Sequence, residues 1–424
     1  MNIVEMNILV VTKAAWDDRL ASGNTLSNFF GDWKNVNFSC LYSRATKPNN
    51  KVCKEFYSIS PVSIIKNLLI PSRIGKRFEY VFADKSLETD DTEAKILGTA
   101  KRNKVIFELV YYLAYSTNLW NNKSFKKFIE DCRPNIVFCF GQSDPLTYKA
   151  IKFIKQHTNA KIISYYVDDL YRDTVSIFNF LQKLKNRYLK EIAKMSDRCY
   201  AISQKMCDEY KELYGKEFHL LHKGCDISKP KKIVNTPVRF VYAGNLFYHR
   251  YKILGALAKS IAKLNIDSAK AHLDIFTGTP VSDNVLSMLN IKGASTLHKT
   301  RSFDEIKQIM KDADVVLHVE SFDEEQMKLV RLSFSTKITD CMQSGAMMLA
   351  IGPPSVASID YATRVPGCVV VNDLEKLDET VQSLVANSTL IIDNAAKTNK
   401  FAMEHVELSQ LRNKIHMEFE NLIK

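Results

Sequence analysis

Residues 334–351, FSTKITDCMQSGAMMLAI, contain the pattern from which the fold of this chain is predicted. After Lys337 the apolar side chains recur at i, i+3 and i+4, which is the spacing of an amphipathic helix. Gly345 is typical of the residue that ends such a helix, and residues 347–351 form an apolar run of strand length. The stretch therefore predicts a helix followed by a buried strand, which is one step of an α/β fold.

The beginning of this predicted helix is suited to an anion. Ser335, Thr336 and Lys337 place two hydroxyls and an ammonium where free backbone N–H groups and the positive end of the helix dipole converge. Asp340, one turn later, could accept hydrogen bonds from the vicinal hydroxyls of a ribose. An ordinary N-cap with a solvated lysine explains the same residues equally well, so this segment alone leaves both interpretations open.

A second segment favours the anion interpretation. Residues 238–243 are apolar and strand-like, Gly244 and Asn245 follow them, and a helix-spaced segment begins near Arg250 and Lys252. A glycine at a strand end lets a ligand approach the backbone, while arginine and lysine bind phosphate as a fork and as a point charge. A solvated basic face is the alternative. Two such loops in one half of the chain are better explained by one shared diphosphate ligand.

The length and composition are those of a globular protein with more than one domain. The chain has 424 residues, of which 46% are hydrophobic and 25% are charged, so two or three domains are expected. Its nine cysteines are odd in number and include no Cys-x-x-Cys pair, which favours a reducing cytoplasm. The first residues lack the basic region of a signal peptide, and no apolar run is long enough for a spanning helix, so we expect neither.

Charge is distributed unevenly along the chain. Residues 1–232 contain 38 Lys and Arg against 25 Asp and Glu, whereas residues 233–424 contain 21 against 22. A basic half predicts an anionic partner, such as nucleic acid, anionic lipid headgroups or a polyphosphate. Because the chain has no RNA-binding run, zinc-ligand spacing or arginine-rich arm, we do not expect it to bind nucleic acid.

Strand-like and helix-like segments alternate along both halves of the chain. Strands are expected at residues 6–12, 36–42, 136–141, 160–167, 199–203, 218–222, 238–243, 272–276, 296–299, 314–319, 347–351 and 368–371. This alternation predicts an α/β protein with two Rossmann-like, doubly wound parallel-sheet domains that face a cleft. Ligands of such sheets bind beyond the carboxyl ends of the strands, where all the motifs described above lie.

The boundary between the two predicted domains is expected near residue 230. The segment 222–240 contains two prolines and a basic cluster, which is typical of a linker. The sequence therefore predicts an N-terminal, acceptor-binding domain over residues 1–228 and a C-terminal domain over residues 229–395. Residues 396–424 carry no sheet signal and are expected to form one or more helices, with a return to the first domain as one possibility.

Five segments occur in the order and spacing of a known family. They are MSDRCYAISQKMCDEYKELYG (195–215), LLHKGCDISK (220–229), AGNLFYHRYKIL (243–254), STKITDCMQSGAMMLAI (335–351) and VVVNDLEKLDETVQSL (369–384). Together they resemble the GT-B glycosyltransferases, in particular the retaining, family-4-like enzymes that build bacterial surface polysaccharides such as capsule or O-antigen. The resemblance extends over nearly the full length and is strongest from about residue 195 to residue 375.

The resemblance implies a hexosyltransferase-like, retaining transfer of a sugar from a nucleotide-diphosphate donor to a saccharide, without a metal or other cofactor. It places the donor diphosphate at Gly244, Asn245, Arg250, Lys252, Ser335, Thr336 and Lys337. It places the donor ribose and base at Asp340, Gly278 and Glu320. Asn245 stands where many relatives have an arginine, so Arg250 and Lys252 are expected to supply the charge. Glu320 is expected to replace a glutamate that would fall on Leu332.

Acceptor-binding residues are expected at the strand ends of the first domain. The candidates are Asp17, Arg19, Gly23 and Gln142. The candidate catalytic residues are Asp144, Asp168 and Asp169, because a carboxylate there could orient or deprotonate an acceptor hydroxyl. A turn or helix cap is the alternative role for each aspartate, and Asp144 before a proline is typical of a cap.

Two segments of the first half, residues 61–82 and 105–128, mix aliphatic and aromatic residues with Lys and Arg. This composition suits a membrane interface, and burial in a core explains it equally well. Acceptors in surface-polymer synthesis are often carried on a polyprenyl diphosphate. We therefore expect a saccharide or polyprenyl-diphosphate-linked saccharide as acceptor, and a cytoplasmic protein that binds the anionic inner face of the cell membrane peripherally.

Two other functions remain open from the sequence. A nucleotide-sugar 2-epimerase on the same fold would need carboxylates and histidines in the cleft, for which His249 and His318 are the candidates. A non-catalytic GT-B relative would instead bind a donor or hold a partner protein. The histidine that relatives often carry after a first-domain strand is missing from YYVDDLYRD (165–173), which is consistent with this last reading.

Overall fold

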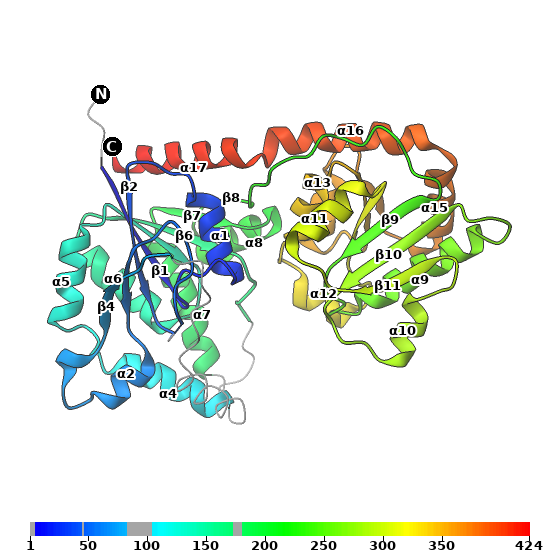
Figure 1. Cartoon of the computed structure of the whole chain (residues 1–424). Helices are drawn as coiled ribbons and strands as arrows, with labels where there is room; N and C mark the ends of the chain where they lie inside the picture. The colour runs from blue at the N-terminus through cyan, green and yellow to red at the C-terminus, as the bar shows by residue number, and fades with distance from the viewer. Residues whose placement is uncertain (1–4, 45, 83–103, 173–179) are drawn as a thin grey trace. The chain divides into compact units, whose positions relative to one another are not determined.

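A computed structural model describes residues 5–44, 46–82, 104–172 and 180–424 of the chain (Figure 1). These residues divide into two compact units. The N-terminal unit comprises the residues up to 202 together with 207–221 and 412–424, and the C-terminal unit comprises 203–206 and 222–411. The structure thus divides the chain a few residues before the predicted boundary at 228, and it assigns the last thirteen residues to the N-terminal unit.

The N-terminal unit is built on an eight-stranded sheet with the order β4-β3-β2-β1-β5-β6-β7-β8. Its strands are β1 (Met6–Thr12), β2 (Val36–Tyr42), β3 (Glu55–Ser58), β4 (Lys76–Glu79), β5 (Ile136–Phe140), β6 (Lys161–Tyr166), β7 (Arg198–Ala201) and β8 (Phe218–Leu220). All neighbouring strands are parallel except β4, which pairs antiparallel with β3 at the edge. The central strands β1 and β5 are mostly apolar and buried because helices cover both faces of a parallel sheet.

The helices associated with this sheet connect successive strands, except for the last. They are α1 (Ala21–Phe30), α2 (Pro61–Lys66), α4 (Lys104–Ser116), α5 (Lys123–Cys132), α6 (Pro145–His157), α7 (Phe180–Met195), α8 (Gln204–Tyr214) and α17 (Leu408–Ile423), with a short 3₁₀ turn, η1 (Pro71–Arg73). Phe419 of α17 packs edge-on against Trp33 at 5.4 Å and lies 6.0 Å from Phe30. These aromatic contacts bury apolar area and hold the end of the chain on the N-terminal unit.

The C-terminal unit is built on a six-stranded parallel sheet with the order β11-β10-β9-β12-β13-β14. Its strands are β9 (Val238–Ala243), β10 (Ala271–Thr277), β11 (Ser295–Lys299), β12 (Val315–Val319), β13 (Met347–Ile351) and β14 (Val369–Val371). Its helices are α9 (Arg250–Leu264), α10 (Asp283–Leu289), α11 (Phe303–Asp312), α12 (Glu324–Val330), α13 (Lys337–Ser344), α14 (Ala357–Thr363), α15 (Leu377–Ala386) and α16 (Ser388–His405), with a short 3₁₀ turn, η3 (Leu374–Lys376). The strand order reverses between β9 and β12, as it does in dinucleotide-binding folds.

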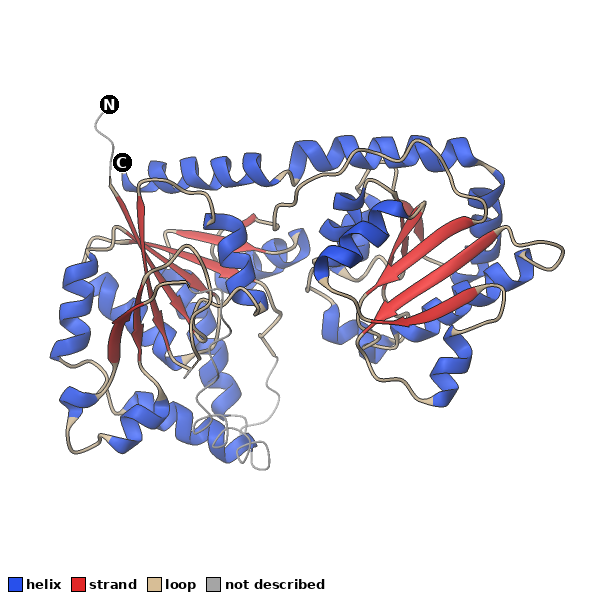
Figure 2. Ribbon diagram, viewed as in Figure 1, coloured by secondary structure: helices blue, strands red, loops and turns tan. Residues whose placement is uncertain are grey.

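The predicted fold class is confirmed, because both units contain doubly wound parallel sheets with helices between the strands (Figure 2). The helix and strand predicted from residues 334–351 are α13 and β13. Gly345 ends α13 with a φ of 79°, and a Cβ at this position would lie 2.2 Å from the carbonyl oxygen of Lys229. Only glycine fits this left-handed turn without strain, so the backbone itself specifies the helix end.

The prediction omitted β3 and β4, and it did not anticipate an antiparallel edge strand. Both strands have only four residues, which is too short for a period-two pattern to be distinguished from a loop. Among the described residues, no helix combines the length and the apolar character that crossing a membrane requires.

Candidate functional site

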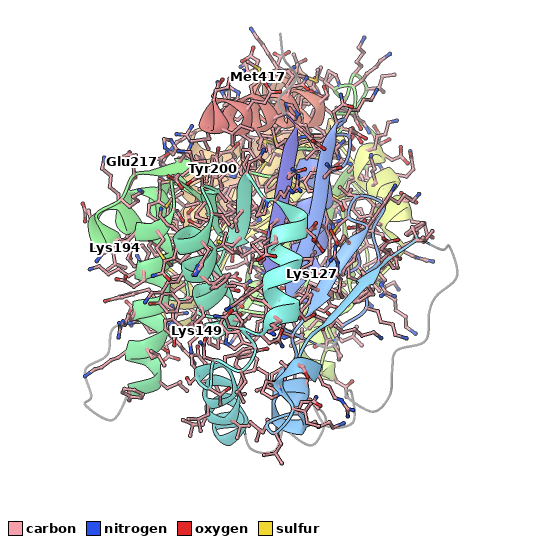
Figure 3. The ribbon with its side chains drawn as sticks, turned by 90° about the vertical axis from the view of Figure 1, so that its left-hand side faces the viewer. Lys127, Lys149, Lys194, Tyr200, Glu217 and Met417 are labelled. Carbon is pink, nitrogen blue, oxygen red and sulfur yellow. The ribbon has the colours of Figure 1, made fainter. Side chains whose placement is uncertain are left out.

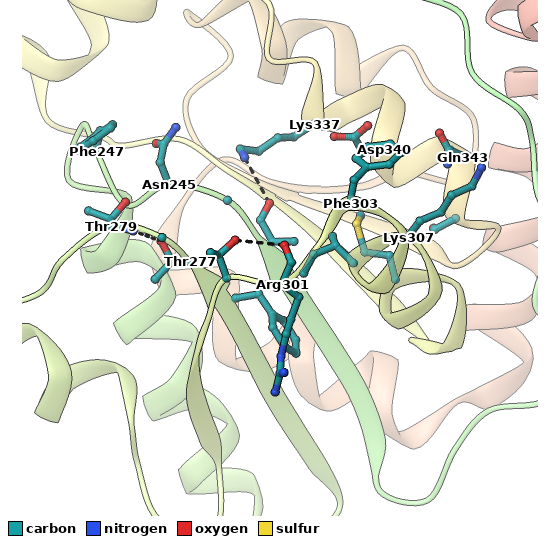
Figure 4. Close-up of a pocket in the computed structure, with 18 of the residues that line it drawn as sticks. Asn245, Phe247, Thr277, Thr279, Arg301, Phe303, Lys307, Lys337, Asp340 and Gln343 are labelled. Carbon is teal, nitrogen blue, oxygen red and sulfur yellow. Dashed lines mark hydrogen bonds between the residues drawn. The ribbon is translucent and has the colours of Figure 1, made fainter. Parts of the chain in front are cut away.

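A cavity of about 560 Å³ lies in the C-terminal unit beyond the carboxyl ends of β9, β10 and β11 (Figure 4). Helices α11 and α13 complete its wall. The cavity thus adjoins β9, at which the strand order reverses, and ligands of doubly wound sheets bind outside the strand ends at such a reversal. Its polar and charged wall residues are Asn245, Thr277, Thr279, Thr300, Arg301, Lys307, Lys337, Asp340, Gln343 and Ser344.

Lys337 joins the beginning of α13 to the end of β9. Its Nζ donates a hydrogen bond to the carbonyl oxygen of Ala243 at 3.3 Å (Figure 4). Gly244 permits this approach, because a Cβ at this position would lie 2.3 Å from the same Nζ. Thr336 precedes the helix without capping it, so its hydroxyl does not satisfy the first N–H groups of α13. An anion in the cavity would meet the ammonium beside the positive end of a helix dipole.

The environment of Lys337 disfavours its charged form. Burial lowers the pKa of its ammonium, and the positive charge of Arg250 lowers the pKa further. The carboxylates of Asp340 and Glu320 act in the opposite direction without cancelling the effect. A phosphate bound beside Lys337 would stabilise the charged form of this lysine and raise its pKa again. The pKa shift therefore indicates a site that favours a negatively charged ligand.

Arg250, predicted to bind the diphosphate, is buried in an ion pair, and its side chain does not line the cavity. Its guanidinium donates to the carboxylate of Glu320 at 2.8, 3.0 and 3.2 Å, and the two side chains are only 7% and 2% exposed. It also donates to Oδ1 of Asn245 at 2.7 Å. The guanidinium therefore orients the side chain of Asn245, which does line the cavity.

Glu320, predicted to bind the ribose or base, is the partner of Arg250 in this ion pair and likewise does not line the cavity. It follows β12 directly, and its carboxylate is turned inward onto the guanidinium of Arg250 because an unpaired charge at this depth is costly. Lys252 is exposed on the first turn of α9 and lies outside the wall of the cavity. Ser335 and Thr336 also lie outside the wall, so Lys337 is the predicted side-chain cation that the structure places in it.

Asp340 lines the cavity one turn into α13, as the sequence suggested, and Gly278 lines it at the end of β10. Burial raises the pKa of the Asp340 carboxyl, whereas the ammonium groups of Lys337 and Lys223 lower it. Lys223 comes from the segment that precedes β9, so the structure adds a cation that the motif did not include. In its ionised form the Asp340 carboxylate could accept hydrogen bonds from a diol.

Several wall residues were not predicted. Thr277 is the last residue of β10, Thr279 and Arg301 follow β10 and β11, and Phe303 and Lys307 belong to α11 (Figure 4). The carboxyl ends of parallel strands meet at one edge, so the positions directly after β10 and β11 could have been selected from the sequence. The residues of α11 could not have been selected in this way, because they line the cavity only as a result of how that helix packs.

The loop after β9 is held in an uncommon conformation. Tyr248 and His249 have φ values of 57° and 58°, in the left-handed region that non-glycine residues seldom adopt. The guanidinium of Arg250 lies 5.3 Å from the ring centre of Tyr248, and His249 Nδ1 lies 3.3 Å from the carboxylate of Asp323. Such strain persists only where the surroundings fix it, which is typical of ligand-binding loops.

The two histidines considered for an epimerase do not line the cavity. His318 is 1% exposed, and its Nε2 lies 3.0 Å from Oγ of Ser358. Burial lowers the pKa of His318 to about 3, so it is neutral at physiological pH. His249 makes its ion-pair contact with Asp323, at the beginning of α12. Neither imidazole is placed for proton transfer to a ligand in this cavity.

The sequence contains one Asp-x-Asp triplet, Asp312 to Asp314, whose metal-binding potential has to be considered. The side chain of Asp314 is fully buried and lies 3.1 Å from the ammonium of Lys231. It also accepts hydrogen bonds from Asn235 and from the backbone N–H of Arg239. This carboxylate fastens the linker before β9 to the sheet and does not project into the cavity.

In the N-terminal unit the candidate catalytic aspartates differ in their surroundings. Asp144 caps α6 by accepting from the N–H and hydroxyl of Thr147 at 2.8 and 3.0 Å, which is the alternative role considered for it. Asp169 accepts from the Tyr210 hydroxyl at 3.2 Å and pairs with Arg172 at 3.6 Å. Asp168 is the most exposed of the three residues, although burial around its carboxyl group raises the pKa of that carboxyl.

The acceptor candidates after β1 stabilise their own loop. Asp17 accepts from the side chain of Arg19 at 2.9 Å through both oxygens and from its backbone N–H at 3.0 Å. Gly23 packs against this turn, because a Cβ there would lie 2.1 Å from the carbonyl oxygen of Asp17. Gln142, directly after β5, is partly exposed.

A polar cluster not predicted from the sequence surrounds Asp144 at the carboxyl ends of β1, β2 and β5. The hydroxyl of Tyr111 on α4 donates to the Asp144 carboxylate, and Ser43 after β2 donates to it at 3.3 Å. The ammonium of Lys13 after β1 lies 5.5 Å from the ring centre of Tyr111. Burial lowers the pKa of Lys13, and the Asp144 carboxylate opposes this shift. The cluster lies where the order of the first sheet reverses.

Comparison with solved structures places this fold among known architectures. The chain matches TarM of S. aureus (TM-score 0.61, 11% identity, 99% of this chain and 100% of that chain). It matches sucrose-phosphate synthase from Thermosynechococcus elongatus (0.59, 10%, 98% and 99%) and Anabaena HepE in complex with UDP (0.59, 11%, 98% and 100%). The chain has the GT-B fold. No family model and no curated protein matches its sequence, and at these identities the structural similarity shows the fold alone.

Proposed function

We propose that the chain is a GT-B glycosyltransferase that binds a nucleotide-diphosphate sugar in the cavity of the C-terminal unit. The observation that carries this proposal is the ammonium of Lys337, held at the first turn of α13 and at the end of β9 beside Gly244. The cavity has the position that a nucleotide occupies in doubly wound sheets. HepE, which shares the fold, has been solved with UDP and with UDP-glucose.

The proposed chemistry follows from the charges in the cavity. As the bond between the sugar and the diphosphate breaks, negative charge grows on the β-phosphate oxygen. The ammonium of Lys337 and the first N–H groups of α13 would stabilise that charge. Asp340 would accept hydrogen bonds from the ribose hydroxyls. The proposal includes a retaining, metal-independent transfer to a saccharide of a cell-surface polymer, as the sequence resemblance implies.

The experiment that tests this proposal is a thermal-shift series with UDP, GDP, ADP and CMP, followed by donor-hydrolysis assays with the matching nucleotide sugars. We expect one nucleotide to raise the melting temperature, and we expect Lys337→Ala to remove most of that rise. Lys252→Ala is the matched control, because this lysine is exposed and outside the cavity wall. If no nucleotide stabilises the protein, or if both variants respond alike, the donor site is not this cavity.

A donor-binding protein without transferase activity is the second candidate. The observation that favours it is that Asp144 caps a helix and Asp169 is bonded to Tyr210, so two of the three candidate catalytic carboxylates are engaged in contacts within the N-terminal unit. Nucleotide binding without hydrolysis or transfer, in the wild type and in Asp168→Asn alike, would favour this second candidate.

All nine cysteines are free thiols, which supports a reducing, cytoplasmic location for either candidate function.

A further inference from the structure

We propose that the N-terminal unit docks on an anionic lipid bilayer through one exposed aliphatic surface. This lipid-facing surface is formed by α2, the turn that follows it and the outer face of α4, and its members are Ile65, Leu68, Leu69, Ile70, Leu109 and Leu113. Leu69 is 96% exposed and Leu113 is 65% exposed. The surface differs from the scattered single apolar residues that most proteins expose, because its members lie on α2, on α4 or in the turn directly after α2, and the two helices contact each other.

The buried tyrosines of α4 make their contacts within the N-terminal unit, so the exposed aliphatic residues of this helix lie on a different face. The hydroxyl of Tyr115 donates to the carbonyl oxygen of Ile59 at 2.6 Å, and Tyr111 is buried against Ser43. Leu109 and Leu113 are four residues apart and therefore share a face of the helix. In Figures 1 and 3, α2 and α4 lie beside each other at the same end of the N-terminal unit.

Positive charge adjoins the aliphatic residues of α2 and the turn after it. Lys66, Arg73 and Lys76 are exposed and form no ion pair with any described residue. The segment 61–82 contains four Lys and Arg against one acidic residue. An aliphatic projection flanked by cations matches the two parts of a bilayer surface with anionic lipids, whose acyl chains accept the leucines and whose headgroups attract the cations. Because the surface is basic, an anionic membrane is a better partner for it than a second copy of the same basic unit.

The position of α4 connects the lipid-facing surface with the proposed function, and this step rests on that function. On the inner face of the helix, Tyr111 bonds to Asp144 and Ser43 at the carboxyl ends of β5 and β2. Lys13 lies beside them at the end of β1. One helix therefore separates a bilayer from a polar cluster at the strand ends. A saccharide acceptor presented on a lipid diphosphate would enter at this end of the unit.

Vesicle co-sedimentation of the full chain tests the inference. We expect binding to phosphatidylcholine vesicles that contain about 30% phosphatidylglycerol, weak binding to pure phosphatidylcholine, and a decrease between about 0.1 M and 0.5 M NaCl. Leu69→Ser should lower the partition coefficient about tenfold, which is the loss expected for one leucine side chain that is no longer buried. Ile266→Ser is the matched control, because Ile266 is 81% exposed in the C-terminal unit.

The cationic part of the surface is tested in the same way. The double variant Arg73→Gln with Lys76→Gln should also lower binding to anionic vesicles at least tenfold and should remove most of its salt dependence. Lys292→Gln, an exposed lysine of the C-terminal unit, is the charge control and should retain binding. All substituted side chains are exposed, so folding should be unaffected, which a melting curve verifies.

The outcomes separate the inference from its alternatives. Absent vesicle binding, equal binding to neutral and anionic vesicles, or equal losses in Leu69→Ser and Ile266→Ser would each overturn the inference. A dimer that Leu69→Ser converts to a monomer, without vesicle binding, would identify a contact between copies instead. Nucleotide stabilisation without vesicle binding would leave the proposed function standing alone. Vesicle binding without any nucleotide response would support the surface and count against the donor cavity.

Discussion

Replacing Gly244 by alanine tests whether the ammonium of Lys337 marks the donor phosphate site. A Cβ at this position would lie 2.3 Å from Nζ and 2.5 Å from Cε of Lys337, and 3.0 Å from the hydroxyl of Tyr242. All three neighbours are side-chain atoms, and the end of a lysine is flexible. The clash is therefore relieved by moving the ammonium away from β9. The strand remains in place, since the backbone N–H of Gly244 donates to Phe276 at 2.9 Å.

The size of the effect follows from the hydrogen bond that is lost. A charge-assisted hydrogen bond to phosphate contributes about 1.5–3 kcal/mol, so displacing the ammonium should raise the Kd of a nucleoside diphosphate about 10- to 150-fold. The free energy of unfolding should change by less than about 1 kcal/mol, because the contacts below 3.0 Å are with the flexible end of Lys337 and the buried hydroxyl of Tyr242 has to move by only a few tenths of an ångström. Affinity and stability should thus separate in Gly244→Ala.

Isothermal titration calorimetry with the most stabilising nucleotide is the assay. Gly278→Ala is the matched control, because Gly278 lines the same cavity but a Cβ there would meet Thr300 at an ordinary 3.6 Å. If the alanine at 244 acts through Lys337, the double variant Gly244→Ala with Lys337→Ala should bind no more weakly than Lys337→Ala alone. Wild-type affinity in Gly244→Ala, an equal loss in Gly278→Ala, or additive losses in the double variant would refute the reasoning.

Three further predictions concern buried charges. Glu320→Ala should lower the free energy of unfolding by about 3–5 kcal/mol in urea denaturation, because it leaves Arg250 buried without its partner; a loss below about 1 kcal/mol would contradict the pairing. Nucleotide affinity, measured by calorimetry, should fall as the pH rises through the lowered pKa of Lys337, before the ordinary lysine value of 10.5 is reached. Lys337→Arg should show no such fall, because arginine stays charged over this range. A wild-type protein whose affinity is constant over the same range would show that the charge of Lys337 does not contribute to binding. Asp144→Ala should cost about 1–2 kcal/mol of stability as a lost helix cap, and an unchanged urea midpoint would show that the cap is dispensable.

The sequence was sufficient for the parts of the fold that depend on local patterns. Mainly apolar runs of strand length predicted β1, β2, β9 and β13, because strands covered on both faces are mostly apolar. The helix after residue 336 was predicted together with Lys337 at its beginning, because the hydroxyls, the cation and the terminating glycine are adjacent in the sequence. Short edge strands such as β4 were missed, since four residues carry too little pattern.

The candidate site was less predictable because its interactions join residues far apart in the sequence. Arg250 and Glu320 are seventy residues apart, and no local pattern shows that they form an ion pair. The cluster of Lys13, Ser43, Tyr111 and Asp144 likewise comes from four segments that meet only in the folded sheet. The strand ends that supply such residues are predictable, whereas the choice of which side chains turn inward depends on packing.

The balance of two energies explains why we expect Lys337, and not Arg250, to be the cation that a phosphate would meet. Turning the guanidinium of Arg250 toward a ligand would leave the carboxylate of Glu320 buried and unpaired, at a cost of about 3–5 kcal/mol. A new hydrogen bond to the phosphate would offset only about 1.5–3 kcal/mol of that cost. The hydrogen bond that Lys337 would break to reach an anion is to a neutral carbonyl at 3.3 Å, so breaking it costs little. The buried pair therefore holds the side chain of Asn245, and we expect the lysine to be the group that would move toward a bound anion.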